Sequence, residues 1–384
     1  MKKIGILTYH RAVNYGAFLQ CLSLVKLLQA KFPQYKIEVI DYETKTEFYI
    51  KIKSLLKSNG VVDFFRKLTM FFHFYSEVHS YLPLSKRRII SNKSGVIRKY
   101  YSNEYEIIIV GSDAVWNNVN NEAKLNFFLK DVACCYKFSY AASTSGLNSQ
   151  NISEQTYLYL QKALVDFYYI GVREEKSEHF IKRISEKLHC EHNCDPTCFL
   201  NLNEFKDNIR ERLISNRISI DKPIVCLMTA NETVGRYVYQ EFHKTHQIIS
   251  IYTYNPFADL VLYDLRPTEF AVFFSHIDIL FSYFFHGAYL CLRNGTPVIA
   301  VDQAIESDGE KSKIKYLFER LGIDKWYFRP NEMNKNDFND MLSLAQSLIN
   351  TSQKDRLAKA LLNESQYSES FINSLSNLIQ NNCE

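Results

Sequence analysis

The stretch Ile277–Val301, IDILFSYFFHGAYLCLRNGTPVIAV, decides the fold of this chain. Four of its first six residues, Ile277–Ser282, are apolar, and this run predicts a buried strand. Ala288–Leu292 predicts a short helix, which Asn294-Gly295 ends, and Pro297–Val301 predicts the next strand. A strand, a tight turn, a helix, a glycine stop and a second strand together make one βαβ unit with parallel strands.

His286 lies in the turn between the first strand and the helix of this unit. The carboxyl end of a strand in such a unit faces the ligand crevice. The helix N-terminus there offers free N–H groups and a partial positive charge, which suit an anion. A titratable imidazole at this point can move a proton beside a bound phosphate or carboxylate. The competing interpretation is a packed, hydrogen-bonded core histidine, and the rest of the chain has to decide between the two.

The composition indicates a globular protein of two domains. A chain of 384 residues exceeds one ordinary hydrophobic core. Its 46% hydrophobic and 23% charged residues exclude a disordered protein. The 27 Phe and 26 Tyr can fill a core or line a surface that faces a saccharide or a lipid. A net charge of +4 suits an anionic small ligand or an anionic membrane, and is too small to indicate nucleic acid.

The first residues predict a buried strand and not a secretory signal, because the apolar run after Lys3 soon meets His10 and Arg11. No stretch reaches the roughly 18 apolar residues that a membrane-spanning helix needs. The nine Cys are an odd number and are expected to be reduced. We therefore expect a cytoplasmic protein, and the alternative of peripheral contact with the inner face of the membrane stays open.

The aromatic segment Phe64–Tyr75 is interrupted by Arg66, Lys67 and His73, and predicts an amphipathic helix. Such a helix either lies on a membrane face or packs on its own domain, which is the commoner arrangement.

A cluster of Cys and His residues lies between His189 and Cys198. Zinc accepts both kinds of ligand, but structural zinc sites usually offer two ligand pairs that a longer loop separates. Here all the candidates crowd one short segment, and Asp195-Pro196-Thr197 predicts a turn that would send neighbouring side chains to opposite faces. We therefore expect no metal site.

Strands alternate with helices along the whole chain, which predicts parallel sheets in both halves. We expect an N-terminal Rossmann-like domain at 1–214, on the acceptor side, with a helical insertion at about 45–101. A C-terminal Rossmann-like domain is expected at 215–350, on the donor side, because it carries the His286 motif. The helices of 351–384 are expected to follow, with packing on the N-terminal domain as an open alternative.

Several short motifs occur in a fixed order along the chain. They are Ile4–Thr8 with Asn14–Gln20, Ile109–Asn117, Ser139–Ser143, Val172–Glu174, Asp195–Thr197, Phe285–Gly287 and Ser312–Ile314. Through these motifs, over positions 4 to about 330, the chain resembles the polysaccharide pyruvyl transferase family.

This resemblance implies an α/β fold of two Rossmann-like domains with parallel sheets that face a cleft, in a GT-B-like arrangement. It also implies transfer of the enolpyruvyl carbons of phosphoenolpyruvate to sugar hydroxyls, which forms a pyruvate ketal on a glycan of the capsule or exopolysaccharide. The implied partners are phosphoenolpyruvate and a lipid-linked oligosaccharide or polysaccharide precursor, with no nucleic acid, no metal and no cofactor besides the donor.

Two positions depart from the family pattern. Phe284 stands where many members carry Arg or Ser, and an apolar ring cannot hold the carboxylate or phosphate of the donor. Lys313 stands where Arg is usual, which keeps the charge and loses the bidentate fork.

The reaction needs a general acid near C3 of the donor, cations for its charges and a base for the acceptor hydroxyl. We predict His286 as the acid, Asp113 as the base or a hydroxyl ligand, and His10 as an alternate proton carrier. The donor contacts are predicted to be Arg173, Lys313 and Gly287, and the acceptor contacts to be Asn14, Gly16, Ser112 and Trp116. The competing roles are an ion pair with Glu174 or Glu175 for Arg173, helix capping for Asp113 and core packing for Trp116.

Two other functions stay open at this point. A GT-B-like glycosyltransferase that uses a nucleotide sugar fits the same fold, because fold alone does not settle function. A non-catalytic relative that binds glycans fits Phe284 and the high aromatic content.

Overall fold

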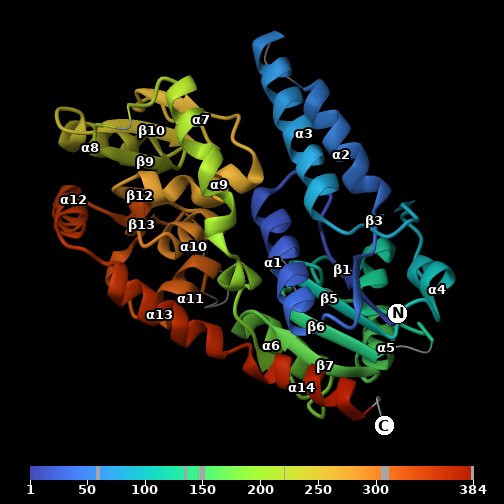
Figure 1. The fold of residues 1–384 in the computed structure, drawn as a ribbon. Coiled ribbons are helices and arrows are strands. Elements are labelled where there is room, and N and C mark those ends of the chain that lie inside the picture. Colours follow the sequence, from blue (N-terminus) through green and yellow to red (C-terminus); the bar gives the residue numbers. More distant parts are fainter. Residues whose placement is uncertain are drawn as a thin grey trace. The chain divides into compact units, whose positions relative to one another are not determined.

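The computed structural model describes residues 1–57, 61–133, 136–145, 147, 152–219, 221–303 and 311–381, and they divide into two compact units. Unit 1 comprises Met1–Leu200 and Ser365–Glu384, and unit 2 comprises Asn201–Glu364. Each unit is built on one six-stranded sheet in which neighbouring strands run parallel (Figure 1). The prediction of two parallel α/β sheets is confirmed.

The sheet of unit 1 has the strand order β2-β1-β5-β6-β7-β8. In this order its strands are β2 (Lys36–Val39), β1 (Lys3–Leu7), β5 (Ile107–Asp113), β6 (Tyr136–Ala142), β7 (Phe167–Val172) and β8 (Glu191–His192). Nearly every residue of β1, β5 and β6 is buried, because helices cover both faces of the sheet. Their sequences are therefore continuous apolar runs and do not alternate with polar residues.

Helices and short 3₁₀ turns connect these strands. They are α1 (Tyr15–Lys31), α4 (Val96–Tyr101), η1 (Glu122–Phe128), α5 (Glu154–Leu164), α6 (Glu175–Ile184), η3 (Pro196–Phe199) and, from the end of the chain, α14 (Glu369–Asn381). Of these helices, α5 begins at Glu154, with Ser153 as its N-cap. Residues 148–151 lie outside the described part of the chain.

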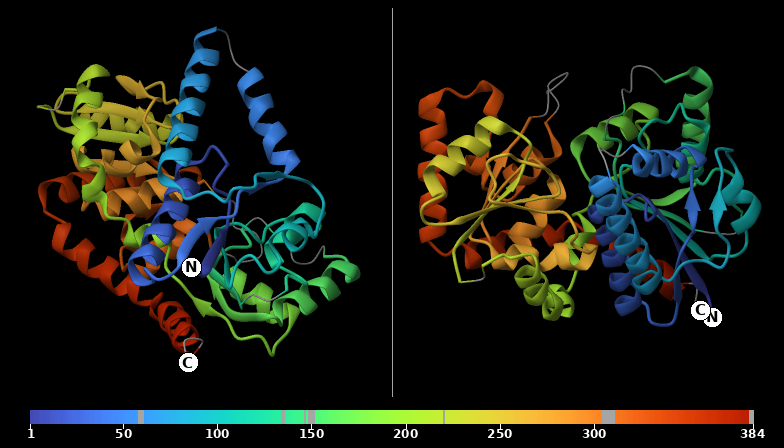
Figure 2. Two further views of the ribbon diagram at one scale, coloured as in Figure 1. Left: turned by 45° about the vertical axis from the view of Figure 1, so that its right-hand side comes forward. Right: turned by 90° about the horizontal axis from the view of Figure 1, so that it is seen from above.

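A helical hairpin leaves the sheet of unit 1 between β2 and β5. It consists of α2 (Lys45–Leu56) and α3 (Val61–Tyr81), which extend side by side away from the sheet (Figures 1 and 2). A two-stranded sheet of β3 (Tyr42–Glu43) and β4 (Ile89–Ile90) closes its base. Of the helices in the described residues, none has the length and apolarity that crossing a membrane requires.

The sheet of unit 2 has the strand order β11-β10-β9-β12-β13-β14. In this order its strands are β11 (Leu260–Leu262), β10 (Gln247–Ile251), β9 (Ile224–Met228), β12 (Ile279–Ser282), β13 (Val298–Val301) and β14 (Tyr327–Phe328). Counted from β9 as the first strand, the order is 3-2-1-4-5-6, which is that of the Rossmann fold.

The helices of unit 2 lie on both faces of this sheet (Figure 2). They are η4 (Leu202–Asn208), α7 (Ile209–Ser215), α8 (Glu232–Phe242), α9 (Pro267–Phe273), η5 (Phe274–His276), α10 (Phe285–Arg293), α11 (Lys313–Arg320), η6 (Asp324–Trp326), η7 (Pro330–Glu332), α12 (Lys335–Asn350) and α13 (Lys354–Gln366).

The boundary between the units lies at Leu200/Asn201, whereas the sequence placed it at 214/215. The reason is that η4 and α7 pack against α9 of unit 2. Arg212 of α7 pairs with Asp264 and Glu269, both at 3.3 Å. The expected boundary at 214/215 therefore lies inside unit 2.

The last helix returns to unit 1. Phe371 of α14 is fully buried and packs its ring against Phe138, Tyr140 and Tyr169, with centroid distances of 6.1, 4.7 and 5.7 Å. Ser368 Oγ lies 2.8 Å from the Tyr140 hydroxyl. The expected segment 351–384 is therefore divided, with α13 almost entirely in unit 2 and α14 in unit 1.

Each sheet reverses its winding at one place. In unit 1 the chain sets β2 on one side of β1 and β5 on the other, and in unit 2 it sets β10 on one side of β9 and β12 on the other. Ligands of open parallel sheets bind outside the carboxyl ends of the strands at such reversals. The loops after β1 and β5, and those after β9 and β12, are therefore where each unit can hold a ligand.

Candidate active site

The carboxyl end of β5 forms the first half of the unit 1 site. Gly111 has a φ of +110°, and a Cβ built there would lie 2.3 Å from the backbone oxygen of Tyr140, so only glycine fits. Ser112 is 1% exposed, and its Oγ has no hydrogen-bond partner among the described atoms. Its carbonyl accepts a bond from Thr8 Oγ1, at the end of β1, at 2.7 Å. The predicted residue Ser112 thus lies at the winding reversal with a hydroxyl left to bond a ligand.

Asp113 ends β5 in a left-handed conformation with a φ of +82°. Its Oδ1 accepts from the amide of Ala114 at 2.7 Å, and its carbonyl accepts from the amide of Ser143 at 2.9 Å. The side chain is partly exposed. No helix follows directly, so the alternative role of Asp113 as a helix cap is excluded.

Asn14 is the N-cap of α1, in the loop after β1. Its Oδ1 accepts from the amides of Gly16 at 3.0 Å and Ala17 at 3.4 Å. Gly16 is buried in the first turn of the helix. The structure shows Asn14 shaping the first strand-to-helix turn, which is a positioning role at the same sheet edge as Ser112.

Arg173 follows β7 and is 5% exposed. Its Nε lies 3.3 Å from Glu174 Oε2, and its Nη1 lies 3.3 Å from Asp195 Oδ2. Burial alone would lower the pKa of this guanidinium, but the charges of Glu174, Asp195 and Asp113 outweigh burial and raise the pKa. The ion pair with Glu174, the competing role from the sequence, is therefore present.

Hydroxyls and an amide complete this buried network. Glu174 Oε1 accepts from Ser143 Oγ at 2.6 Å and from Ser177 Oγ at 2.5 Å. Asp195 Oδ2 accepts from Gln20 Nε2 at 2.5 Å, and the Gln20 Oε1 atom has no partner among the described atoms. One guanidinium thus meets two carboxylates, with Asp113 nearby. The edge of unit 1 carries more negative than positive charge, which suits hydroxyl donors better than an anion.

Sequence reasoning assigned no role to Gln20, Ser143 and Ser177. It named Glu174 only as a competing ion-pair partner of Arg173, and Asp195 only as part of a turn. The signal was available. Polar residues that directly follow a buried parallel strand share one sheet edge, so the ends of β6 and β7 pointed to Ser143 and Glu174. Ser177 lies in the first turn of α6 and Gln20 in the second turn of α1, and their contacts can be recognised only once the fold is known.

Trp116 is not placed to stack on a sugar. Its side chain is 0% exposed, its ring stacks on Phe128 at 5.4 Å, and its Nε1 donates to the carbonyl of Phe127 at 3.2 Å. The predicted acceptor contact is therefore corrected to a core residue beneath the loop that follows β5.

His10 is likewise sealed in the core. It is 0% exposed, with Nδ1 3.2 Å from the carbonyl of Thr8 and Nε2 3.2 Å from Asp41 Oδ1. An imidazole with both nitrogens engaged and no exposed surface cannot deliver a proton to a substrate. The proposed alternate proton carrier is thus a structural residue.

His286 lies at the winding reversal of unit 2. β12 ends at Ser282, whose Oγ accepts from the amide of Phe284 at 2.9 Å and so fixes the turn. α10 begins at Phe285, and no side chain caps its N-terminus. His286 is the second residue of the helix and is partly exposed. The predicted strand, turn and helix are all present, and the imidazole stands in the first turn.

Close packing explains why a glycine occupies position 287. A Cβ built there would lie 2.4 Å from the Sδ of Met228, the last residue of β9. The glycine therefore allows α10 to approach the carboxyl end of β9, which is the strand on the other side of the reversal. This close approach holds His286 at the edge of the sheet.

Lys313 lies beside this edge. β13 neighbours β12, and Asp302 directly follows β13. Asp302 accepts from the Ser312 hydroxyl and from the Tyr327 hydroxyl, and Ser312 caps α11 by accepting from the amide of Lys315 at 3.2 Å. Lys313 is the first residue of α11, and α11 contacts α10. Residues 304–310 of the preceding loop lie outside the described part of the chain.

Phe284 belongs to a group of aromatic rings at the same edge. Its ring centroid lies 5.2 Å from that of Tyr252 and 4.1 Å from that of Tyr283. Tyr252 follows β10 with a φ of +65°, and burial raises the pKa of its hydroxyl. The position that departs from the family pattern is thus occupied by a ring that packs edge-on against Tyr252 and tilted against Tyr283.

The predicted residues fall into two groups. Asn14, Gly16, Ser112, Asp113 and Arg173 gather at the carboxyl edge of the unit 1 sheet, and His286, Gly287 and Lys313 gather at that of unit 2.

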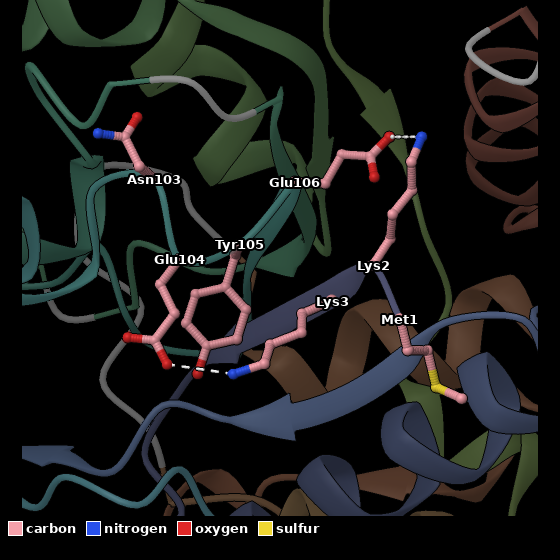
Figure 3. A pocket seen from close by; sticks show the side chains of 7 residues that line it. All are labelled: Met1, Lys2, Lys3, Asn103, Glu104, Tyr105 and Glu106. Carbon is pink, nitrogen blue, oxygen red and sulfur yellow. Dashed lines mark hydrogen bonds and ion pairs between the residues drawn. The ribbon is translucent and has the colours of Figure 1, made fainter.

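A separate cavity of about 330 Å³ lies at the opposite, amino-terminal end of β1 and β5 (Figure 3). Ion pairs from Lys2 to Glu106 and from Lys3 to Glu104 line it, and it holds none of the predicted site residues.

Side chains of the Cys and His segment from 189 to 198 contact other protein residues. His192 pairs with Glu178 at 2.7 Å, and Cys194 Sγ lies 3.1 Å from Ser368 Oγ. Across the described residues, no three His, Cys, Asp or Glu side chains gather in a group that could hold a metal ion.

Comparison with solved structures identifies relatives of the fold. Sucrose-phosphate synthase from Thermosynechococcus elongatus is 12% identical with a TM-score of 0.51, and 99% of each chain is covered. UDP-GlcNAc 2-epimerase from Neisseria meningitidis, bound to UDP-GlcNAc, is 12% identical with a TM-score of 0.54, and 98% of this chain and 100% of that chain are covered. The UDP-GlcNAc 2-epimerase from Methanocaldococcus jannaschii is 11% identical with a TM-score of 0.51, over 92% and 94% of the two chains. These likenesses show a GT-B-like fold.

No curated protein matches the sequence. The model of one protein family does match, over residues 14–304, which is about three quarters of the chain. The matched range contains Asn14, the loop after β5, Arg173 and the turn with His286. The chain belongs to the polysaccharide pyruvyl transferase family.

Proposed function

We propose that this protein transfers the pyruvyl group of phosphoenolpyruvate to two hydroxyls of a sugar in a cell-surface polysaccharide precursor and forms a ketal. The observation that supports this most is the position of His286. It stands in the first turn of α10, at the winding reversal of a Rossmann-like sheet, within the range that matches the family. An imidazole at the N-terminus of a helix combines a proton donor with a site suited to an anion.

The proposed reaction is an addition followed by an elimination. C3 of phosphoenolpyruvate takes a proton, so positive charge develops at C2. An acceptor hydroxyl attacks C2 and gives up its proton, and the bond from C2 to the phosphate oxygen breaks. The second hydroxyl then attacks C2, its proton leaves, and the ketal closes. The products are the ketal and inorganic phosphate, and no redox step occurs.

His286 is proposed to give the proton to C3. Proton transfer from a positioned side chain is worth about 10²–10⁴ in rate. The amides of the first turn of α10, which no side chain caps, and the ammonium of Lys313 are proposed to hold the negative charges of the donor. Gly287 supports this arrangement because it lets α10 approach β9 closely.

The edge of unit 1 is proposed to hold the acceptor. Sugar hydroxyls donate well to carboxylates, and Asp113 and the unpaired Ser112 Oγ lie at this edge. Asp113 is the proposed base for the acceptor hydroxyl. Arg173 stays a predicted donor contact, although a phosphate would have to replace Glu174 or Asp195 on its guanidinium.

The test is phosphate release by the purified protein with phosphoenolpyruvate and candidate lipid-linked oligosaccharides, with mass spectrometry of the product. His286→Ala is expected to lower the rate by about 10²–10⁴. His243→Ala is the matched control, because His243 is an exposed histidine of the same unit that stacks on Tyr239. An undiminished rate in His286→Ala would remove the proposed acid.

A second candidate function rests on the aromatic group of Tyr252, Tyr283 and Phe284 at the edge of unit 2. Flat rings at this edge would also accept the base of a nucleotide sugar, which the N. meningitidis neighbour binds. Thermal-shift titration separates the two functions. Stabilisation by UDP-GlcNAc without stabilisation by phosphoenolpyruvate would favour the nucleotide sugar.

A further inference from the structure

The hairpin of α2 and α3 presents large apolar side chains to solvent. Of the eighteen large hydrophobic residues that are exposed among the described residues, eight lie in this short segment. Six of the eight are 59% to 73% exposed, and they are Tyr49, Ile50, Leu56, Val61, Phe65 and Phe72. An exposed apolar cluster of this kind marks a surface that binds something, because scattered single residues would be the ordinary case.

The exposed residues follow the helical repeat. On α3, Val61, Phe65 and Phe72 are separated by four and seven residues, so they form one stripe. On α2, Tyr49 and Leu56 are separated by seven residues and form a stripe in the same way. The side of α3 that carries Phe74 and Val78 is fully buried in unit 1 instead. Each helix is therefore amphipathic, with an apolar stripe that its own unit leaves uncovered.

The charges beside these stripes are positive. Lys45, Lys53 and Lys57 are exposed on α2 and at its end. Among the described side chains of the hairpin only two are carboxylates, Glu47 and Glu77. Glu47 pairs with Lys124 and closes the capping box of α2, and Glu77 is 3% exposed.

The base of the hairpin is fixed to the end of β1. Lys51 Nζ donates to the carbonyl of Arg11 at 3.0 Å, and the Tyr75 hydroxyl donates to the same carbonyl at 3.2 Å. Arg11 in turn holds Asp41 through two bonds of 2.7 Å. The hairpin is thus anchored to the loop that follows β1.

We propose that this hairpin docks on the surface of an anionic lipid bilayer. The apolar stripes enter the boundary between headgroups and acyl chains, and the lysines meet the lipid phosphates. A second copy of the chain is a poorer occupant, because it would place lysines against lysines. Docking does not depend on catalysis. It goes beyond the proposed function because it places the end of β1 at the membrane, where the acceptor would be bound on its lipid carrier.

The test is co-sedimentation of the full-length protein with vesicles. We expect binding to vesicles of phosphatidylcholine with phosphatidylglycerol, little binding to phosphatidylcholine alone, and weaker binding at high salt. Lys53→Gln with Lys57→Gln is expected to lower the partition coefficient about fivefold for each removed charge. Phe65→Ser with Phe72→Ser is expected to lower it about fivefold for each ring, since a ring is only partly buried at the interface.

Matched controls lie outside the hairpin. Leu362→Ser removes an apolar side chain of α13 that is 64% exposed, and Lys31→Gln with Lys335→Gln removes two exposed charges of other helices. Each control is expected to bind vesicles as the natural protein does. Circular dichroism and the melting temperature establish that every variant is folded.

Binding that the hairpin variants and the controls share equally would overturn the proposal. The proposal would also be overturned if the protein bound no vesicles and instead formed a concentration-dependent dimer that Phe65→Ser with Phe72→Ser abolishes. The partner of the hairpin would then be a second copy of the chain. The proposed function is tested apart from this. Phosphate release with a short-chain acceptor in detergent-free solution is expected to be the same in the hairpin variants, and a protein that binds vesicles and releases no phosphate would refute the function alone.

Discussion

Asp41→Asn tests whether the buried charges at the end of β1 hold unit 1 together. Asp41 is 4% exposed and accepts from Arg11 Nε and Nη2, both at 2.7 Å, and lies 3.2 Å from His10 Nε2. Arg11 is itself only 3% exposed. The amide keeps the shape of the side chain and removes its charge, so the buried guanidinium loses the carboxylate that it is hydrogen-bonded to.

Breaking a buried ion pair by removal of one partner costs about 3–5 kcal/mol. In a domain of about 150–250 residues, each 1 kcal/mol lowers the melting temperature by roughly 2–4 °C. Unit 1 is of this size. The transition of unit 1 in Asp41→Asn is therefore expected roughly 6–20 °C below that of the natural protein at pH 7.

The pH dependence follows from the pKa of Asp41. Burial would raise this pKa, but the hydrogen bonds and charges of His10 and Arg11 outweigh burial and hold it well below its ordinary value. A carboxyl whose pKa is lowered by folding stabilises the folded state above its unfolded pKa, which is about 3.9. That stability is lost as the pH falls from there towards the folded pKa. The two proteins should thus differ fully at neutral pH and progressively less below about pH 4.

Differential scanning calorimetry from pH 8 to pH 3 measures this difference. Asp355→Asn is the matched control, because Asp355 is exposed in the first turn of α13 and should change the melting temperature little at any pH. A deficit in Asp41→Asn that stays the same from pH 7 to pH 3, or that is no larger than in the control, would refute the role of the buried charges.

Three further substitutions test the unit 1 site. Gly111→Ala should lower the melting temperature by several degrees, because the added Cβ would lie 2.3 Å from the backbone oxygen of Tyr140 at a φ of +110°, and a clash with backbone costs about 1–3 kcal/mol or more. Trp116→Ala should cost about 3–5 kcal/mol in chemical denaturation, since the ring is fully buried on Phe128, while the KM for the sugar acceptor stays unchanged. Arg173→Lys should lower kcat/KM by about tenfold in the phosphate-release assay, because an ammonium cannot bridge two carboxylates as the guanidinium fork does, and an unaltered value would place Arg173 outside the site.

Much of the fold could be predicted from the sequence because its strands are buried on both faces. The run Ile107–Val110 and the stretch Ile279–Phe281 are apolar without interruption. Such continuous runs are typical of parallel strands that helices cover on both faces. The boundary at Leu200/Asn201 could not be predicted in this way. The helices that follow it, η4 and α7, are short and polar, and their attachment to α9 depends on contacts such as that of Arg212 with Glu269.

The candidate site residues likewise divide into those that the sequence could predict and those that it could not. His286 and Ser112 were found because each lies at the carboxyl end of a buried strand, and the chain itself sets that relation. Trp116 was misjudged because an indole that follows the same strand points either to the edge or into the core, and only the packing on Phe128 decides. Gln20 was missed because its bond to Asp195 joins positions 175 residues apart, and no local pattern predicts such a contact.

The return of α14 to unit 1 has a consequence for the order in which the two units can be completed during synthesis. Unit 2 is one continuous stretch, so all of its residues are synthesised before α14 is. Phe371 is synthesised last of the four aromatic residues that pack together here, so the rings of Phe138, Tyr140 and Tyr169 stay uncovered until it is made. The half of the protein that begins the chain therefore cannot be completed until the whole of the other half has been made, and until then it exposes aromatic surface that a chaperone can bind.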